Sequence, residues 1–235
     1  MNTAAAPLGH ASFSIGALPV PPVIRAKAGA AEVSIIQNRP TLVVSLKEAQ
    51  APYALYDEPI PFEDLDLLAA SFPFPIYRRS HQAITKKNAE ADKPLLDGLR
   101  AKGFKLTSGP DGSGWQIMYG NRGGGYYFDA GCSQMIVDGR VGLLQYDDIE
   151  RFCADGALMK DGSVRQADLI VLATGYKGQK EAVRGILGDE ITDRIGPVWG
   201  FDDGGRLPGR RFRRSRGGDP QRSRCARAGP PHRHP

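Results

Sequence analysis

The chain has 235 residues, of which 41% are hydrophobic and 24% charged, enough apolar material for a packed core. Its net charge of +5 arises at one end: residues 206–235 contain ten Arg and one Asp, and without this surplus of nine, residues 1–205 carry −4. A mildly acidic body excludes a basic nucleic-acid-binding face there, and no apolar run approaches the length of a membrane span. We therefore expect no nucleic-acid or membrane partner, and three cysteines without a CxxC pair indicate reduced thiols in the cytoplasm.

The first part of the chain predicts a leader followed by a buried strand. Residues 1–28 are rich in Ala, Pro and Gly without a clear hydrophobic period, which predicts an irregular segment. Residues 33–36 are β-branched and apolar, and a polar tip of Gln37, Asn38 and Arg39 follows them before Pro40. This pattern fits the second strand of a dinucleotide-binding unit, where an Arg beyond the strand accepts a 2′-phosphate. The alternative is any buried strand that ends in a charged residue.

The next hundred residues predict helices and a glycine-rich connection. A short helix is expected over residues 62–71, and a long surface helix over residues 76–99 that restarts at Pro94. His81 lies on this helix, where we expect a solvated face, with a ligand-facing role as the alternative. Residues 107–125 are rich in Gly and predict a turn-rich connection packed with aromatic rings; a phosphate-binding loop is the alternative, without the strand–GxGxxG–helix context.

Short strands are predicted in the following part of the chain. A short helix is expected within residues 129–137, with Cys132 on it, and Asp-Gly turns punctuate the strands that follow. These strands predict a β-meander, and they cover residues 141–146, 149–152, 157–160 and 163–165.

The meander leads into a further predicted strand, residues 169–173, whose five apolar residues follow Asp168 and stop at Thr174-Gly175. Such a run is typical of a strand buried on both faces, and its carboxyl end is where α/β sheets bind ligands. Gly175 there allows a tight turn or a close backbone approach.

The C-terminal part changes character. A helix is expected over residues 180–187, and residues 196–201 predict an aromatic turn. Residues 206–235 consist almost wholly of Arg, Pro, Gly, Ser, Ala and His without a period, which predicts a disordered Arg-rich tail. We interpret this composition as a shifted reading frame of a GC-rich gene. No catalytic residue and no metal site follow from the cysteines and histidines, because none has a partner at an informative spacing.

Six stretches, in this order, resemble the C-terminal part of bacterial flavin-containing monooxygenases, relatives of the Baeyer–Villiger enzymes. The resemblance covers about residues 29–205. The stretches are Ala-Glu-Val-Ser-Ile-Ile-Gln-Asn-Arg-Pro-Thr (31–41), Leu-Leu-Asp-Gly-Leu (95–99), Arg-Gly-Gly-Gly-Tyr-Tyr-Phe (122–128), Asp-Asp-Ile-Glu-Arg-Phe (147–152), Ala-Asp-Leu-Ile-Val-Leu-Ala-Thr-Gly-Tyr-Lys-Gly-Gln (167–179) and Gly-Pro-Val-Trp-Gly-Phe (196–201).

The resemblance implies an NADPH-binding domain inserted into an FAD-binding domain, an α/β fold with a partial Rossmann-like domain, a β-meander, an incomplete FAD domain and disordered ends. It implies four regions: a leader (1–28), a partial NADPH-binding domain (29–176), a return segment toward the FAD domain (177–205) and the tail (206–235). The implied activity is FAD- and NADPH-dependent monooxygenation, with oxygen inserted through a flavin peroxide into a small organic substrate. The implied cofactor-binding residues are Gln37, Asn38, Arg39, Ala173, Thr174, Gly175 and Tyr176.

The chain also departs from this family pattern. The strand–GxGxxG–helix elements that hold the pyrophosphates of FAD and NADPH are absent from the sequence. We therefore expect a fragment that is inactive alone and binds neither cofactor tightly. Two alternatives stay open: a non-catalytic remnant that pairs with a separate flavin half, and nucleic-acid binding through the Arg-rich tail. The substrate and the oligomeric state do not follow from the sequence.

Overall fold

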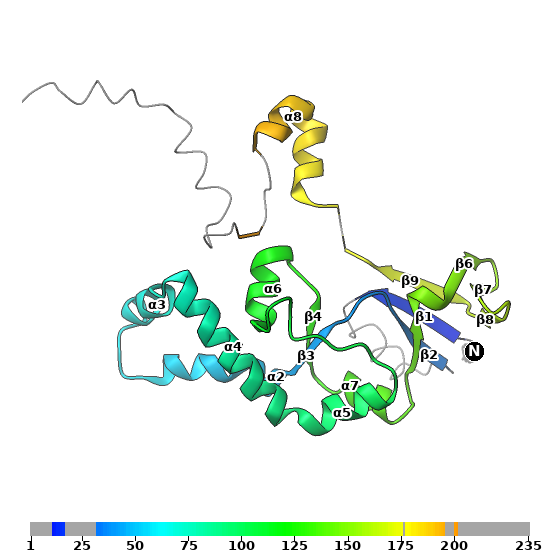
Figure 1. Cartoon of the computed structure of the whole chain (residues 1–235), viewed down its shortest axis with the longest axis horizontal. Coiled ribbons are helices and arrows are strands. Elements are labelled where there is room, and N and C mark those ends of the chain that lie inside the picture. Colours follow the sequence, from blue (N-terminus) through cyan, green and yellow to red (C-terminus); the bar gives the residue numbers. More distant parts are fainter. Residues whose placement is uncertain (1–10, 17–31, 176, 196–199, 202–235) are drawn as a thin grey trace, which may run out of the picture. The chain divides into compact units, whose positions relative to one another are not determined.

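The computed structural model describes residues 11–16, 32–175, 177–195 and 200–201 (Figure 1). The described residues up to Gly178 form one compact α/β unit, and the residues from Gln179 onward belong to a second. The strands are β1 (Ala11–Gly16), β2 (Glu32–Gln37), β3 (Leu42–Ser45), β4 (Tyr126–Asp129), β5 (Gly142–Gln145), β6 (Ile149–Cys153), β7 (Gly156–Met159), β8 (Val164–Gln166) and β9 (Leu169–Ala173). The helices are α2 (Leu46–Gln50), α3 (Phe62–Ala70), α4 (Phe74–Ala91), α5 (Lys93–Ala101), α6 (Gly114–Arg122), α7 (Cys132–Val137) and α8 (Gln179–Ile195), with 3-10 turns η1 (Ala51–Asp57) and η2 (Tyr146–Asp148).

Four parallel strands form the main sheet in the order β5-β2-β1-β9. Counted along the sheet by their order in the chain, these are strands 3, 2, 1 and 4, which is the order of a dinucleotide-binding fold. The expectation of an α/β fold with a Rossmann-like part is confirmed. One correction is needed: β1 lies within residues 1–28, which the sequence predicted to be irregular. It forms because β2 and β9 pair with it on both sides.

Strand β2 is buried on both faces, as its apolar run predicted. Ile35 packs into the largest apolar cluster, together with Leu99 of α5 and Ile136 of α7. Ile36 points the other way, because successive side chains alternate across a strand, and packs against Ala157 of the meander. Only a central strand of the sheet is covered on both sides in this manner.

The predicted β-meander is reduced to three antiparallel strands, β6, β7 and β8. The predicted strand over residues 141–146 is observed as β5, but it joins the parallel sheet beside β2. The close approach of the two strands at Gly142 shows why a glycine stands there: a Cβ on it would lie 2.4 Å from the Oγ of Ser34. The Asp-Gly turn at residues 138–139 therefore links α7 to the sheet and belongs to no hairpin.

The prediction that residues 169–173 are buried on both faces is wrong. Strand β9 lies at the edge of the four-stranded sheet and pairs with β1 alone among the described strands. Leu169 is 47% exposed and Leu172 is 67% exposed, so β9 presents apolar side chains to solvent. An apolar run indicates a strand, but its position in the sheet depends on which partners the fold supplies.

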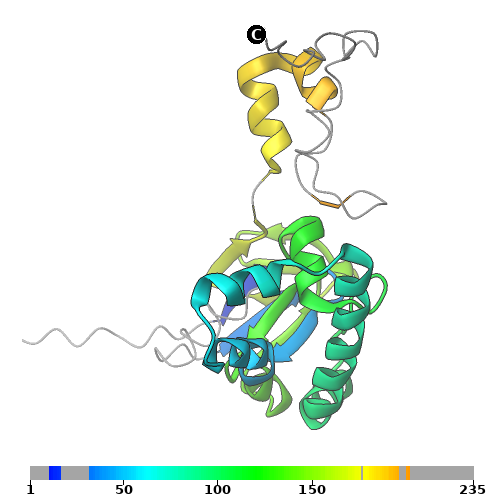
Figure 2. The same cartoon turned by 90° about the vertical axis from the view of Figure 1, so that its left-hand side faces the viewer.

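A second sheet pairs β3 with β4 in parallel and packs against helices (Figures 1 and 2). The aromatic side chains expected in this region form a cluster in which the Trp115 ring lies 4.9 Å from Phe128 and 5.6 Å from Tyr126. The glycine-rich connection is not all turns, however, because residues 114–122 form α6. This helix ends at Gly123, whose φ of 67° is the left-handed conformation of a helix C-terminus.

The long helix predicted over residues 76–99 is confirmed as α4 and α5, with the break at Asp92. Pro94 lacks an N–H group and stands at the start of α5, the position where a helix tolerates it. The sequence predicted a solvated face for His81, and this prediction is wrong. His81 is 9% exposed, and its ring packs edge-on against Tyr77, with ring centroids 4.1 Å apart. Tyr77 lies one turn before His81 on the same helix.

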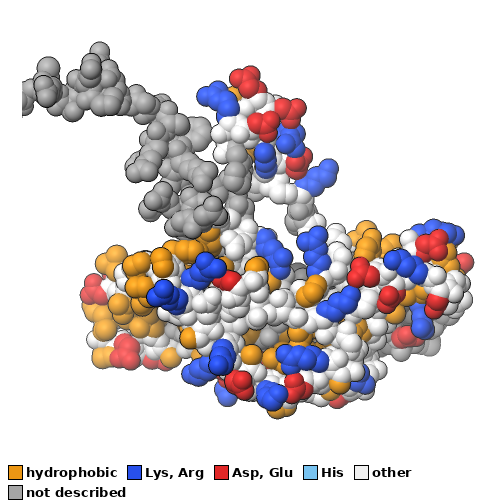
Figure 3. Space-filling model, in the orientation of Figure 1, with side chains coloured by type: hydrophobic (Ala, Val, Ile, Leu, Met, Phe, Trp, Pro, Cys, Tyr) orange, Lys and Arg blue, Asp and Glu red, His pale blue; other side chains and the backbone are white. Residues whose placement is uncertain are grey.

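Large apolar side chains gather on the surface over α3 and the neighbouring turns (Figure 3). Tyr53, Phe62 and Leu67 are 67%, 67% and 69% exposed. Contiguous exposed apolar patches of this kind are uncommon on monomeric proteins.

The predicted helix over residues 180–187 is observed as α8, which continues to Ile195 across a break at Gly188.

Candidate functional site

The carboxyl ends of β2, β1 and β9 lie at one edge of the main sheet. Ile15 pairs with Ile36, and Gly16 pairs with Ala173, so the ends of β2 and β9 flank the end of β1. Two strand spacings separate β2 from β9, which is about 10 Å. The structure thus places residues 37–39 and 173–175, predicted as two halves of a cofactor site, at the same edge of one sheet.

Gln37 holds the strand end to the rest of the unit. Its Nε2 donates to the Lys105 carbonyl at 2.8 Å, and its Oε1 accepts from the Lys105 N–H at 2.8 Å. The same amide also meets Gln145 Nε2 at 3.1 Å and Thr41 Oγ1 at 3.5 Å. These four contacts use both donors and both acceptor positions of the amide. Gln37 is buried and its amide serves the fold, while its predicted contact with a cofactor stays a prediction.

The next two residues project into solvent. Asn38 and Arg39 are exposed, and the turn that carries them is held by the Thr41 hydroxyl, which donates to the Arg39 carbonyl at 3.0 Å. Pro40 follows directly and restricts the backbone before it. The Arg39 guanidinium makes no ion pair with any residue in the described part of the chain, so its five N–H donors face water. An anion at this edge of the sheet can accept hydrogen bonds from these N–H groups.

The end of β9 forms the other side of this edge. Ala173 is half-buried, and Thr174 and Gly175 are exposed. Gly175 has a φ of 80°, in the left-handed region that favours glycine, and a Cβ built on it would meet no described atom within 4 Å. The glycine is therefore required by its backbone conformation and not by a close approach. Tyr176 lies outside the described residues.

A pocket of about 440 Å³ opens beside the end of β5. Its basic lining residues are Lys102, Lys160 and Arg165. Gln145, the last residue of β5, also lines it and stands level with Gln37 in the register. The Oε1 of Gln145 is buried and has no hydrogen-bond partner in the described structure. Sequence reasoning missed this residue; the signal for it is a polar residue at the end of a strand, as at Gln37.

Other titratable groups lie away from this edge. Burial raises the pKa of the Cys132 thiol to about 12, so this cysteine is an inert part of the core. Burial raises the pKa of Tyr127, whose hydroxyl lies 2.7 Å from that of Ser133. Over the ranges that the structure describes, no group of three or more His, Cys, Asp or Glu side chains is arranged to hold a metal ion. No described helix is long and apolar enough to cross a bilayer.

Solved structures with a similar fold are flavin-dependent monooxygenases. An oxidized steroid monooxygenase bound to NADP superposes with a TM-score of 0.51 at 15% identity, over 82% of this chain and 45% of that protein. The chain has the fold of part of a flavin monooxygenase. A cyclohexanone monooxygenase mutant from Rhodococcus sp. Phi1 bound to NADP+ is also similar (TM-score 0.47, 12% identity, 78% of this chain, 42% of that protein). So is the FAD-bound form of OTEMO (TM-score 0.44, 16% identity, 72% of this chain, 38% of that protein).

This chain spans less than half the length of each of these three proteins. The sequence matches no protein-family model, and no curated protein matches it. At 15% identity, the likeness to the steroid monooxygenase concerns the fold alone, a mixed α/β unit with parallel strands.

Proposed function

We propose that this chain carries the NADP(H)-binding region of an FAD- and NADPH-dependent monooxygenase, with the adenosine 2′-phosphate held at the carboxyl edge of the main sheet. The observation that carries the proposal is Arg39, which follows the second strand of a 3-2-1-4 parallel sheet with its guanidinium unpaired in the described structure. In dinucleotide-binding folds, this is where an Arg accepts the 2′-phosphate that distinguishes NADP from NAD. The NADP named for the steroid monooxygenase supports the same reading.

The residues present fit one end of the cofactor better than the other. Asn38 and Arg39 offer exposed donors to a phosphate, and β9 ends nearby at Thr174 and Gly175. The pyrophosphate needs a glycine-rich turn after the first strand, yet residues 16–31 contain only Gly16 and Gly29 and no GxGxxG. We therefore infer weak binding of the dinucleotide, dominated by the adenosine 2′-phosphate.

NADPH supplies a hydride for flavin reduction when it is bound, and the flavin supplies the oxygen chemistry. The contribution of this chain is to bind and orient the phosphorylated adenosine through a positive side chain at a fixed sheet edge. No residue of the described structure is assigned to the flavin. We infer that the isolated chain is inactive and retains no flavin, and that monooxygenation of a small organic substrate belongs to the protein together with an FAD-binding part.

Titration with adenosine 2′,5′-bisphosphate and adenosine 5′-monophosphate tests the phosphate site, because the two probes differ only in the 2′-phosphate. We expect the bisphosphate to bind roughly tenfold more tightly, since hydrogen bonds to charged groups contribute about 1.5–3 kcal/mol. Arg39→Gln should abolish this preference. Arg140→Gln is the matched control, because Arg140 is equally exposed but precedes β5, at the opposite edge of the sheet. Equal affinity for both probes, or an equal loss in both variants, contradicts the proposal.

The expectation of weak flavin binding has its own test. An absorption spectrum of the purified full chain reports bound flavin directly. We expect no flavin band, and a band that corresponds to nearly one flavin per chain would contradict the assignment of flavin binding to a separate part. The flavin spectrum and the nucleotide titration are independent tests, because the phosphate preference is attributed to Arg39 and flavin binding is not.

A further inference from the structure

A second pocket, of about 550 Å³, lies between β3, α4, α5 and Trp115 of α6. Its volume is in the range of pockets that hold small organic molecules. Apolar walls come from Leu42, Leu96 and Leu106. The lining contains one charged residue, Arg100, and no acid. The pocket is therefore apolar with a single positive group.

Trp115 lines this pocket and carries an unsatisfied donor. The indole Nε1 is buried and has no hydrogen-bond acceptor in the described structure, although the ring itself is well packed between Tyr126 and Phe128. An indole N–H only donates, and a buried donor without a partner is costly, so such groups are rare in folded proteins.

The free edge of β3 adds a backbone donor. Leu42 donates its N–H toward β4, to the Gly125 carbonyl at 3.0 Å, so the alternate residues of β3 face the other way. On that other side the Thr41 N–H reaches the Lys105 carbonyl at 2.9 Å, and the Ser45 N–H reaches Asp92 Oδ2 at 2.7 Å. Val43 lies between these two and lines the pocket. Its N–H and C=O thus face the pocket, along the edge of β3 that lies opposite β4.

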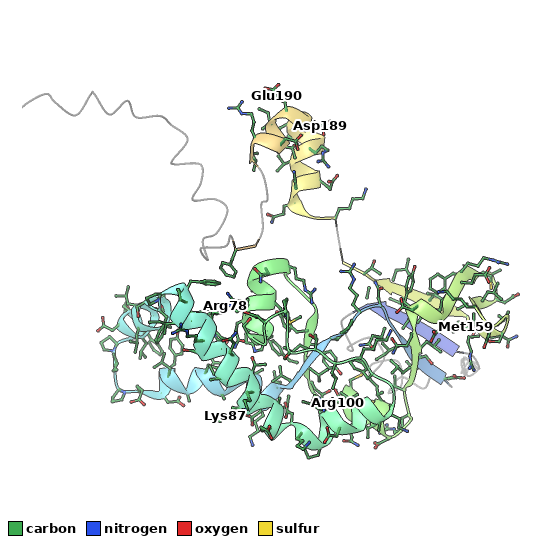
Figure 4. The ribbon with its side chains drawn as sticks, viewed as in Figure 1. Arg78, Lys87, Arg100, Met159, Asp189 and Glu190 are labelled. Carbon is green, nitrogen blue, oxygen red and sulfur yellow. The ribbon has the colours of Figure 1, made fainter. Side chains whose placement is uncertain are left out.

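Arg100 projects from α5 and supplies the charge (Figure 4). One of its N–H groups, on Nη1, bonds Asp97 Oδ1 at 2.7 Å, which leaves four donors on the guanidinium. The amide of Asn88, a buried residue of α4, also lines the pocket and makes no hydrogen bond to another described side chain. The polar groups around the apolar walls are these donors, one of them cationic, and the hydroxyls of Thr85, Thr107 and Ser108, which both donate and accept.

We propose that this pocket binds a small organic carboxylate with an apolar body. The carboxylate would accept from Arg100, and the body would fill the space between Leu42, Leu96 and Leu106. An amide in the ligand would pair with the N–H and C=O of Val43 as an added strand does. The lining of this pocket includes neither Asn38 nor Arg39, the residues proposed above to hold the nucleotide phosphate.

Fluorescence of Trp115 provides the test. The chain contains a second tryptophan, Trp199, so the measurements use a Trp199→Phe background in which Trp115 is the single indole. The probes are hippurate, which has a carboxylate, an amide and an apolar ring, and its uncharged counterpart hippuramide. We expect saturable changes of the Trp115 emission by hippurate, roughly tenfold tighter than by hippuramide.

Two variants decide whether Arg100 carries the preference. Arg100→Gln should remove the tenfold preference for hippurate and leave the affinity for hippuramide unchanged. Lys93→Gln is the matched control, because Lys93 also pairs with Asp97 on the same helix, at 2.9 Å, but does not line the pocket. Circular dichroism confirms that each variant is folded. Absence of saturable binding by hippurate at millimolar concentration, or equal loss in both variants, overturns the proposal.

Discussion

Replacing Gln37 by Met should destabilise the fold through the loss of its hydrogen bonds alone, because Met has a similar length and is apolar. The amide holds the N–H and the C=O of Lys105, each at 2.8 Å, and receives a third bond from Gln145 at 3.1 Å. The Lys105 carbonyl keeps a second donor, the Thr41 N–H at 2.9 Å, whereas no other partner is shown for its N–H in the described structure. The N–H of Lys105 therefore bears the main cost.

The size of this effect follows from typical values. A net hydrogen bond contributes about 0.5–1.5 kcal/mol, and a buried group left without a partner costs about 1–3 kcal/mol. Two lost backbone bonds, partly offset by the more apolar Met, predict a loss of about 2 kcal/mol in the free energy of unfolding.

Urea unfolding of the full chain, followed by Trp115 fluorescence in the Trp199→Phe background, measures this loss. The matched control is Gln134→Met, the same substitution at an exposed residue whose amide bonds Asp138 one helical turn away at 2.7 Å. Its expected cost is at most about 0.5 kcal/mol. If the two variants differ by less than about 0.5 kcal/mol, the assignment of Gln37 to a structural role is wrong.

Three further predictions concern buried groups and backbone strain. Burial lowers the pKa of His81, so the unfolded chain takes up a proton that the folded chain resists. Stability should therefore fall as the pH drops below about 6.5, the pKa of an unperturbed His. The urea midpoint of His81→Phe should lack this pH dependence. An equal pH dependence of the midpoint in both proteins would contradict the prediction. In a Cys225→Ser background, a thiol reagent should modify exposed Cys153 in the folded protein and buried Cys132 only in urea; fast reaction of both would refute the burial. Gly114→Ala should cost about 2 kcal/mol, because its Cβ would lie 2.0 Å from the Oγ1 of Thr85. Gly112→Ala, at a similar φ of 75° but with no atom within 4 Å, should cost about 1 kcal/mol, and urea midpoints that are equal for the two variants would exclude the clash.

Local sequence signals located most of the elements. Apolar runs predicted β2 and β9, the prolines bounded α3 and α4, and Pro94 marked the start of α5. These features depend on neighbours in the chain, since a missing N–H or a β-branched run acts over a few residues. The polar tip of residues 37–39 was located on the same basis.

Strand β1 shows where such signals fail. Residues 12–15 alternate Ser, Phe, Ser and Ile, a strand pattern, but the flanking Pro and Gly residues concealed it. What stabilises β1 is pairing with β2 and β9, the second of which lies more than 150 residues further along the chain. The exposure of β9 also depends on distant segments, because β9 pairs with β1 on one side and with no described strand on the other.

The sequence by itself thus determined most of the strands and helices, though not β1 or α6, and that a polar tip with an arginine follows the second strand of the sheet. Only the tertiary structure decided that the Gln37 amide is hydrogen-bonded within the fold while the Arg39 guanidinium has no ion-pair partner in the described structure. The reason is that the partner of Gln37 is the backbone of Lys105, 68 residues away. Likewise, only the structure brings Trp115 and Arg100 to one pocket beside Val43. Hydrogen-bond partners and pocket walls arise from packing between distant segments, whereas helices and turns arise from the residues next to one another.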